Sequence, residues 1–409
     1  MTLSFRLSTT ANAVQELRAS VKRAKNGYSI TATAAGEGER TLVAFTAEQA
    51  RRALSVTANR ASRLREPSNG AELIIITRPQ FAAGLARLVA LRQSQGLAVT
   101  MVDLEDIYDE FSFGQKSAQA IKEFLTYAGT SWKRKPSFVL FGGDASLDPR
   151  NYLGLGDWDV VSSKLVDTQQ METVSDDWLA DKDGDGLADL ATGRLPFRTA
   201  DEAALLVSKI IRYETAAAAE SILIASDSTD EYSFEAASEQ LKRLIPSHIR
   251  VEEVRRGELG DMSANSRLIE AINRGQKIVN YTGHGSVDMW RGGLLASADI
   301  AKLNNEDRLS VFVTMTCLNG YFQDASLDSL AERLLKAERG GAVAVWASTG
   351  MTSPEGQAAI NQELYRLIFG AGGQSMRIGE AARRAKAATG DEDIRRSWIL
   401  FGDPTMRLK

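Results

Sequence analysis

The sequence predicts an α/β fold of mostly parallel strands with helices on both faces. Three observations predict it: short apolar runs typical of strands buried on both sides, helical periodicity between these runs, and repetition of the alternation from residue 72 onward. Repeated βα units favour parallel strands joined by helical crossovers. We therefore expect an N-terminal β-hairpin-containing appendage and linker over residues 1–68, then two tandem α/β subdomains over residues 69–218 and 219–409.

The N-terminal segment follows a different pattern from the rest of the chain. YSITATAA and RTLVAF flank Gly36-Glu37-Gly38 and alternate apolar with polar residues, which predicts a β-hairpin. Thr46 and Gln49 indicate a helix cap before EQARRAL. RLREPSNGA is typical of a linker. We interpret this region as the end of an upstream β domain.

The first α/β half has strand patterns at ELIIIT, LAVTMVDL and PSFVLFGGD. A helix is predicted over residues 81–95, where Leu85, Leu88 and Val89 share one face and Gly96 ends the pattern. SAQAIKEFLTYA predicts a second helix, and DLATGRLP with the helical DEAALLVSKIIRYE closes this half.

The second half repeats the alternation. Its strand patterns are SILIASD, KIVNYTGHG, LSVFVTMTC and GAVAVWAST, and its helical patterns include SLAERLLKAERG and EGQAAINQELYRLIFG. Functional residues in such folds lie at the carboxyl ends of the strands. We therefore expect the functional site at the carboxyl ends of these strands.

Composition excludes several classes of function. The chain is 44% hydrophobic and 25% charged, as expected for a soluble globular protein. A net charge of −4 with scattered Lys and Arg gives no reason to expect a nucleic-acid partner. No Gly-rich nucleotide motif follows a strand, so we expect no organic cofactor. No apolar run approaches the roughly 20 residues of a membrane span, and the N-terminus lacks the apolar core of a secretory signal.

The chain has one cysteine and two histidines, so few residues are candidates for a nucleophilic thiol and a catalytic imidazole. Cys317 directly follows VFVTMT, and His284 follows KIVNYT between two glycines. Because neighbouring parallel strands end at the same edge, we expect His284 and Cys317 to emerge side by side. His248 lies between a helix and a strand, and we expect it on the surface without a catalytic role.

A thiol beside an imidazole is suited to nucleophilic catalysis. The imidazole can take the thiol proton and later protonate the leaving amine, which contributes roughly a hundred- to ten-thousand-fold in rate. The backbone N–H groups of Gly285 and Cys317 are candidates for an oxyanion hole. The alternative is structural: a lone cysteine after a strand is often a small buried hydrophobe, and a histidine between glycines is often a turn residue.

The segment from YTGHGS to Trp290, followed by TCLNGYF, resembles the catalytic blocks of the gingipain family of bacterial cysteine peptidases, in the caspase-like clan. FGGDASLDP, SDDWLADKDGDGLADLATGRLP, SLAERLL, GGAVAVWASTG and WILFGDPTMRL occur in the family's order over residues 70–409. The resemblance implies a caspase-like architecture, with Cys317 as nucleophile, His284 as its partner, and Gly285 and Cys317 as oxyanion donors.

The resemblance also points to METVSDDW. A carboxylate assists the histidine in this family, and Glu172 and Asp176 are both candidates here. Asp176 or Asp177 is a candidate for the acidic group that binds a basic substrate side chain. Trp178 and Trp290 are candidates for lining the cleft, with core packing as the alternative for each.

The segment DKDGDGLAD begins like a calcium loop, with alternating carboxylates around glycines. Thr192 stands where an EF-hand has its bidentate glutamate, so the match to that motif is partial. The resemblance favours structural Ca²⁺, and a solvated acidic turn is the alternative. We expect Asp144, Asp148 and Asp403 to be turn residues. The predicted calcium ligands are Asp181, Asp183, Asp185 and Asp189.

The predicted function is that of a cysteine endopeptidase, which forms a thioester acyl-enzyme on Cys317 and acts on a protein or peptide. Two alternatives stay open: a sortase-like transpeptidase that uses the same dyad, and a non-catalytic binding module on a caspase-like scaffold. By resemblance, we expect a secreted or cell-surface location and a place within a larger exported protein.

Overall fold

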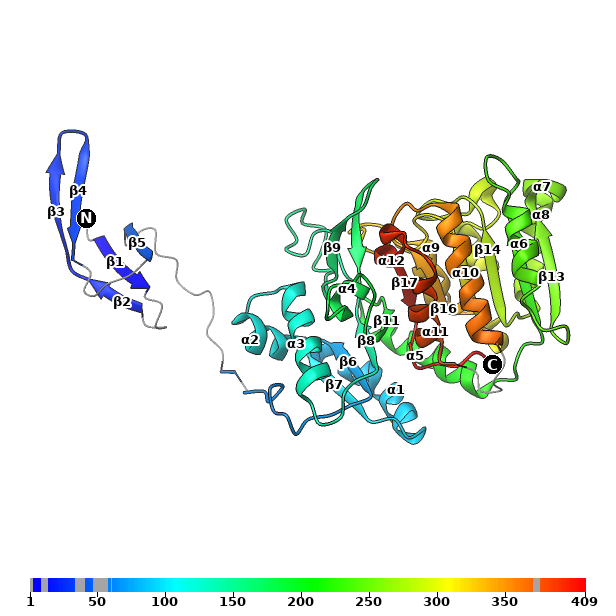
Figure 1. The fold of residues 1–409 in the computed structure, drawn as a ribbon, viewed down its shortest axis with the longest axis horizontal. Coiled ribbons are helices and arrows are strands. Elements are labelled where there is room, and N and C mark those ends of the chain that lie inside the picture. Colours follow the sequence, from blue (N-terminus) through cyan, green and yellow to red (C-terminus); the bar gives the residue numbers. More distant parts are fainter. Residues whose placement is uncertain (1–2, 9–13, 34–40, 47–57, 60, 371–375) are drawn as a thin grey trace. The chain divides into compact units, whose positions relative to one another are not determined.

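The computed structural model describes residues 3–8, 14–33, 41–46, 58–59, 61–370 and 376–409 (Figure 1). The chain divides into two compact units, Met1–Ala61 and Ser62–Lys409. Within these described ranges, none of the helices has both the length and the apolar character that crossing a membrane requires.

The first unit contains two small antiparallel sheets. β1 (Leu3–Ser8) lies between β2 (Val14–Leu17) and β5 (Thr41–Thr46), and β3 (Ala19–Ala24) forms a hairpin with β4 (Gly27–Ala32). The strands predicted at YSITATAA and RTLVAF are thus present as β4 and β5, but β4 pairs with β3 and β5 pairs with β1. The tight turn between β3 and β4 closes a shorter loop than the predicted pairing needs. Gly36-Glu37-Gly38 and Gln49 lie outside the described residues.

The second unit is built on one ten-stranded sheet. Its strands follow the order β13-β12-β14-β15-β16-β17-β11-β8-β6-β7 (Figure 1). Seven of them (β6, β8, β11, β14, β15, β16 and β17) are buried along their whole length, which agrees with the mostly apolar sequences of the strands. The ten strands are β6 (Leu73–Thr77), β7 (Val99–Asp103), β8 (Phe138–Gly142), β11 (Ala191–Leu195), β12 (Ser221–Ser226), β13 (Arg250–Arg255), β14 (Ile278–Thr282), β15 (Ser310–Met315), β16 (Ala342–Ser348) and β17 (Trp398–Phe401).

Helices cover both faces of this sheet, as predicted. α1, α5, α8 and α9 pack in one layer, and α3, α6, α10 and α11 pack in the other. The helices are α1 (Ala82–Ser94), α2 (Leu104–Ser112), α3 (Ala118–Ser131), α4 (Asp177–Ala180), α5 (Ala200–Thr215), α6 (Phe234–Lys242), α7 (Arg256–Leu259), α8 (Asp261–Asn273), α9 (Leu330–Lys336), α10 (Pro354–Phe369), α11 (Ile378–Ala385) and α12 (Glu392–Ser397).

The two predicted α/β halves share this sheet and meet where β17 lies beside β11. β17 is antiparallel to β16 and parallel to β11, so the strands of the two halves run in opposite directions. A separate hairpin, β9 (Lys164–Asp167) and β10 (Glu172–Ser175), lies against the end of β16, where the Thr349 hydroxyl donates to the Val174 carbonyl at 2.9 Å.

The chain changes direction across the sheet at β12 and β14. β12 is followed by β13 on one side, whereas β14 leads to β15 and β16 on the other. In open α/β sheets such a switch point leaves a crevice at the carboxyl ends of the strands, where ligands bind. The loops after β12, β14 and β15 meet at this edge.

Candidate active site

His284 and Cys317 follow neighbouring strands at equivalent positions. β14 and β15 are paired in parallel, with Thr282 opposite Met315, and each candidate residue lies two positions beyond. The Gly283 N–H donates to the Met315 carbonyl at 3.1 Å, which extends the pairing toward the two side chains. The strand register therefore brings together the two residues that the sequence predicts as a pair.

The Cys317 thiol is partly buried beside a turn with an unusual backbone. Its Sγ lies 3.6 Å from the Thr352 carbonyl and 3.5 Å from the Thr352 N–H nitrogen. Burial raises the pKa of the thiol, and the Thr352 contacts only partly offset this effect. Leu318 has a φ of 62°, in the left-handed region that bulky side chains rarely adopt. A thiol with a raised pKa needs a base to become a nucleophile.

His284 is accessible, and its ring has a defined partner. The His284 side chain is 47% exposed, and its Nε2 lies 3.0 Å from the Asp230 carboxylate in the loop after β12. The Phe234 ring meets the imidazole edge-on, with ring centroids 5.1 Å apart. The backbone is held as well, because the His284 N–H donates to Asp227 at 3.2 Å.

The two predicted oxyanion donors are available. Across the described residues, neither the Gly285 N–H nor the Cys317 N–H donates to a protein acceptor. Gly285 lies so close to the neighbouring strand end that a Cβ there would be 2.6 Å from the Thr316 hydroxyl. Glycine therefore allows the loop after β14 to approach the loop after β15.

Asn319 and Trp290 connect these two loops. Trp290 is fully buried and stacks on Tyr281, with ring centroids 4.1 Å apart. Its indole N–H donates to the Asn319 amide oxygen at 2.8 Å, and the Asn319 amide donates to the Ser286 carbonyl at 2.6 Å. For Trp290 the sequence left two roles open, cleft lining and core packing. In the structure it packs beneath the loop, because the aromatic ring and the N–H both find buried partners.

The carboxylates of the segment METVSDDW, residues 171–178, are not the ones that contact the His284 ring. Asp176 accepts two hydrogen bonds from Arg194, both at 2.7 Å, and both residues are buried. The neighbouring Asp177 accepts from Thr192 at 2.7 Å and from Lys386 at 2.5 Å.

These cationic partners already neutralise the two aspartates that were candidates for binding a basic substrate side chain. Glu172 is exposed at the start of β10. Among the described residues, the carboxylate that contacts the His284 ring is Asp230, which the sequence did not identify as a candidate. Its one sequence signal is its place just after the strand pattern SILIASD.

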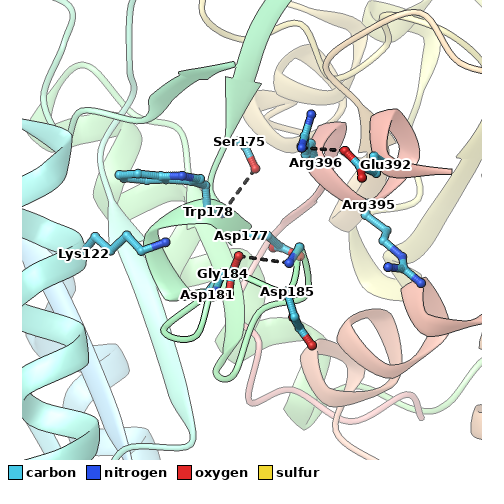
Figure 2. A pocket seen from close by; sticks show the side chains of 11 residues that line it. Lys122, Ser175, Asp177, Trp178, Asp181, Gly184, Asp185, Glu392, Arg395 and Arg396 are labelled. Atoms are coloured by element: carbon cyan, nitrogen blue, oxygen red, sulfur yellow. Dashed lines mark hydrogen bonds and ion pairs between the residues drawn. The ribbon is translucent and has the colours of Figure 1, made fainter. Parts of the chain in front are cut away.

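Trp178 borders a pocket between the α4 region and α12. Figure 2 shows Lys122 and Trp178 on one side, and Glu392, Arg395 and Arg396 on the other. The Lys122 ammonium lies 4.3 Å from the centre of the Trp178 ring. The position of Trp178 is compatible with the predicted cleft role, which stays a prediction. The pocket is completed by Ser175, Asp177, Asp181, Gly184, Asp185 and Gly186.

Three of the four predicted calcium ligands converge. Asp181, Asp183 and Asp189 each offer a carboxylate oxygen, and these oxygens lie within 4.8 Å of one another. Asp185 is outside this group, and its carboxylate accepts the Leu187 N–H at 2.9 Å. An all-oxygen donor set of this kind fits Ca²⁺, which takes its remaining ligands from carbonyls and water.

The three aspartates that were expected in turns have structural partners. Asp144 pairs with Arg198 at 2.6 Å, and Asp403 pairs with Arg92 at 2.7 Å. Asp148 accepts the N–H groups of residues 152 and 153, as a turn residue does. His248 is exposed, as expected.

Comparison with known proteins gives the family. The family model described as peptidase family C25 matches residues 66–409. Gingipain R2 of Porphyromonas gingivalis is 32% identical over 157 residues, which cover 35% of this chain and 21% of the relative. Lys-gingipain of the same organism is 22% identical over 268 residues, or 58% of this chain and 15% of the relative. The chain thus matches about a fifth or less of the length of these relatives.

Solved structures share the fold. The Arg-specific cysteine proteinase gingipain R superposes with a TM-score of 0.70 at 20% identity, over 85% of this chain and 80% of that one. Dimeric latent PorU from Porphyromonas gingivalis matches with a TM-score of 0.54 at 18% identity, over 99% of this chain and 36% of that one. Because the family model covers most of the sequence, the chain belongs to peptidase family C25, the gingipain-type family of cysteine peptidases.

Proposed function

We propose that the chain is a cysteine endopeptidase that uses Cys317 and His284 as its dyad. The observation that carries the proposal is the register of β14 and β15, in which the two residues follow paired positions at one sheet edge. Two backbone N–H groups without protein acceptors, those of Gly285 and Cys317, lie in the same two loops. This combination supplies a nucleophile, a base and an oxyanion hole.

In the proposed reaction, His284 takes the Cys317 proton as the sulfur attacks the peptide carbonyl. A C–S bond forms, the N–H groups of Gly285 and Cys317 stabilise the oxyanion, and the C–N bond breaks as His284 protonates the leaving amine. Water, deprotonated by His284, then attacks the thioester. The C–S bond breaks, the carboxyl product leaves, and the sulfur takes back a proton from His284. Because burial raises the pKa of the Cys317 thiol, the resting thiol is neutral at pH 7 and proton transfer accompanies attack.

We also propose that Asp181, Asp183 and Asp189 hold a structural Ca²⁺ that stiffens the loop after α4. The support is the convergence of three carboxylates in one loop. No step of the reaction depends on this ion. An exported or cell-surface location is proposed on the family resemblance, and fractionation of cells that express the native gene would test it.

Peptide cleavage with a small amine present is the test of function. Wild type, Cys317→Ala and His284→Ala are incubated with a peptide library, and the products are identified by mass spectrometry. We expect cleavage by wild type and loss of at least roughly a thousandfold in both variants. Products that carry the amine would instead indicate the transpeptidase. Identical, empty results for all three proteins, together with a Cys317 that resists alkylation, would support the binding module.

A further inference from the structure

The first turn of α9 joins the two loops that carry the proposed dyad. The Leu330 N–H donates to the Val287 carbonyl, in the loop after β14, at 2.8 Å. The Ala331 N–H donates to the Asn319 carbonyl, in the loop after β15, at 3.0 Å. Val287 and Asn319 each lie two or three positions after a dyad residue. The position of α9 therefore affects how the two site loops lie against each other.

A buried glutamate holds this first turn. Glu332 forms a capping box with Ser329, in which the Ser329 N–H donates to the Glu332 carboxylate at 2.8 Å and the Glu332 N–H donates to the Ser329 hydroxyl at 3.4 Å. Both side chains are fully buried. Glutamate is rarely buried completely unless its charge is balanced by neighbouring groups. The equivalent capping glutamate of α5, Glu202, is 30% exposed.

Glu332 belongs to a group of charged side chains from three segments. Its carboxylate lies 3.1 Å from the Lys336 ammonium, which also contacts Asp328 at 3.1 Å. Asp144, in the loop after β8, is fully buried and pairs with Arg198, in the loop after β11, at 2.6 Å. Arg198 also lies 3.9 Å from Asp328. We call these five residues the α9 cluster.

The α9 cluster has one negative charge more than its cations neutralise. Three carboxylates face two cations when every group is ionised. The other charged groups around the first turn of α9 offset one another in two pairs: Glu202 with Arg333 at the rim, and Asp299 with Lys302, which bond at 2.7 Å. A buried carboxylate without a balancing cation takes up a proton.

The pKa values of the two fully buried carboxylates agree with this count. Burial raises the pKa of Glu332 to about 8, and repulsion from Asp144 acts in the same direction. Burial also raises the pKa of Asp144, to about 6, because Arg198 offsets only part of the effect. Near pH 7 one proton therefore stays on Glu332. The Ser329 hydroxyl can accept from a protonated carboxyl as well as donate to an ionised one, so the capping contact is possible in both states.

We infer that Glu332 is a positioning residue for the proposed reaction: as a neutral group it keeps the first turn of α9 against the loops of His284 and Cys317, and its ionisation loosens that turn through repulsion from Asp144. The inference rests on the proposed function for its meaning in catalysis, but the loop contacts can be tested without substrate. Among the described residues, the polar contacts of Glu332 are with Ser329 and Lys336, so it acts on the dyad through α9.

The other end of α9 is held by Lys209 of α5. Its buried ammonium donates to four backbone carbonyls, those of residues 334, 335, 337 and 340. Burial lowers the pKa of Lys209 to about 7, so this group also titrates near neutral pH. Lys209 is present in wild type and in every variant below, so a comparison at each pH isolates the effect of the α9 cluster.

Three substitutions change the charge balance of the cluster in known directions. Glu332→Gln and Asp144→Asn each remove one carboxylate and keep the shape of the side chain, so that two carboxylates face two cations without a proton. Lys336→Met removes one cation, so the excess negative charge grows. Glu202→Gln is the matched control, because it changes a capping glutamate that is partly exposed.

Hydrogen exchange of residues 318–336, read by mass spectrometry, reports the loop contacts without substrate. After correction for the intrinsic exchange rate, we expect Glu332→Gln and Asp144→Asn to keep roughly tenfold more protection than wild type at pH 9. Lys336→Met should lose protection about one pH unit earlier than wild type. Glu202→Gln should follow wild type at each pH.

The pH dependence of the unfolding equilibrium is the second readout. Because the pKa of Glu332 is raised from 4.5 to about 8, the stabilisation by its proton is fully present below the unfolded pKa and is lost as the pH rises through about 8. Over this range one proton changes the folding equilibrium constant by up to about tenfold per pH unit. Glu332→Gln should therefore have a flatter profile than wild type and Glu202→Gln.

The pH profile of kcat/KM relates the cluster to catalysis. We expect the alkaline limb to move to higher pH in Glu332→Gln and Asp144→Asn, and to lower pH in Lys336→Met, by roughly one unit each. Shifts of opposite sign are not expected from general loss of structure. Asp144→Asn makes the same change of charge from a different segment, so it decides the test if Glu332→Gln does not fold.

The outcomes separate this inference from the peptidase proposal. A wild type that cleaves nothing, but whose protection depends on the cluster as described, contradicts the peptidase and supports the role of Glu332. Protection and stability profiles of Glu332→Gln and Asp144→Asn that match those of Glu202→Gln at every pH overturn the inference.

Discussion

The loop after β12 and the loop after β10 both begin with a Ser-Asp pair and carry a second aspartate within three residues. In the first loop Asp230 is partly exposed and shares one oxygen between His284 and Arg291. In the second, Asp176 and Asp177 are buried and bonded to Arg194 and Lys386. The aspartates of both loops therefore have cationic partners, but Asp230 also meets an accessible imidazole.

The tryptophans of the two regions show the reverse arrangement. Trp290, near His284, is fully buried against Tyr281, whereas Trp178, beside Asp177, borders a pocket. Burial, set by neighbouring elements, therefore distinguishes the structural residues of these regions from those proposed to act in the chemistry. Four changes test it, from the largest expected effect to the smallest.

Trp290→Ala should have the largest effect on stability. It empties a fully buried site and leaves the Asn319 amide oxygen without its indole donor, so we expect the free energy of unfolding to fall by roughly 4 kcal/mol. Urea denaturation measures this change. Trp178→Ala is the control and should cost less than about 1 kcal/mol. Equal losses in the two variants would contradict the assignment of Trp290 to the core.

Asp176→Asn should have the second-largest effect on stability. The substitution leaves the Arg194 guanidinium, which is fully buried, without a charged partner, and we expect a loss of roughly 3 kcal/mol in the free energy of unfolding. The measurement is again urea denaturation, with cleavage rate per folded molecule as the second readout. A folded Asp176→Asn protein with wild-type stability but without activity would instead indicate that Asp176 acts in catalysis.

Calcium binding should have a somewhat smaller effect on stability. If Asp181, Asp183 and Asp189 bind the ion in the folded state only, Ca²⁺ at a hundred times its dissociation constant should add about 2.7 kcal/mol to stability. Thermal unfolding with Ca²⁺ or with EDTA checks this. Asp183→Asn should lose the response, and Asp185→Asn, which changes a residue outside the converging group, should keep most of it. Equal loss of the calcium response in both variants would show that the three calcium ligands are wrongly assigned.

Asp230→Ala should have the smallest effect on stability. The pair with His284 is exposed, so the urea midpoint at pH 7 should stay close to that of wild type. Because the pKa of Asp230 is lowered to about 2, any stabilisation by this carboxylate is present above the unfolded pKa, near 4, and is lost as the pH falls toward 2. A large change at pH 7 would mean that Asp230 is structural in the same way as Asp176.

Much of the architecture could be predicted from the sequence, because local patterns carry it. Apolar runs such as KIVNYT and VFVTMT identify strands buried on both faces, and the helices at Ala82–Ser94 and Pro354–Phe369 follow their apolar periodicity. One cysteine and two histidines then leave two possible dyads, and the position of His284 directly after a strand favours its pairing with Cys317. Strand adjacency brings that pair together because parallel neighbours end at the same edge.

What the tertiary structure alone decided is the partner of each side chain. Burial of Trp290 and the choice of Asp230 over Glu172 or Asp176 beside His284 both depend on contacts between distant segments. A sequence states that a carboxylate is present, but its role depends on the cation or imidazole that the fold places beside it. Those neighbours come from strand order and direction across the sheet, which no local pattern encodes.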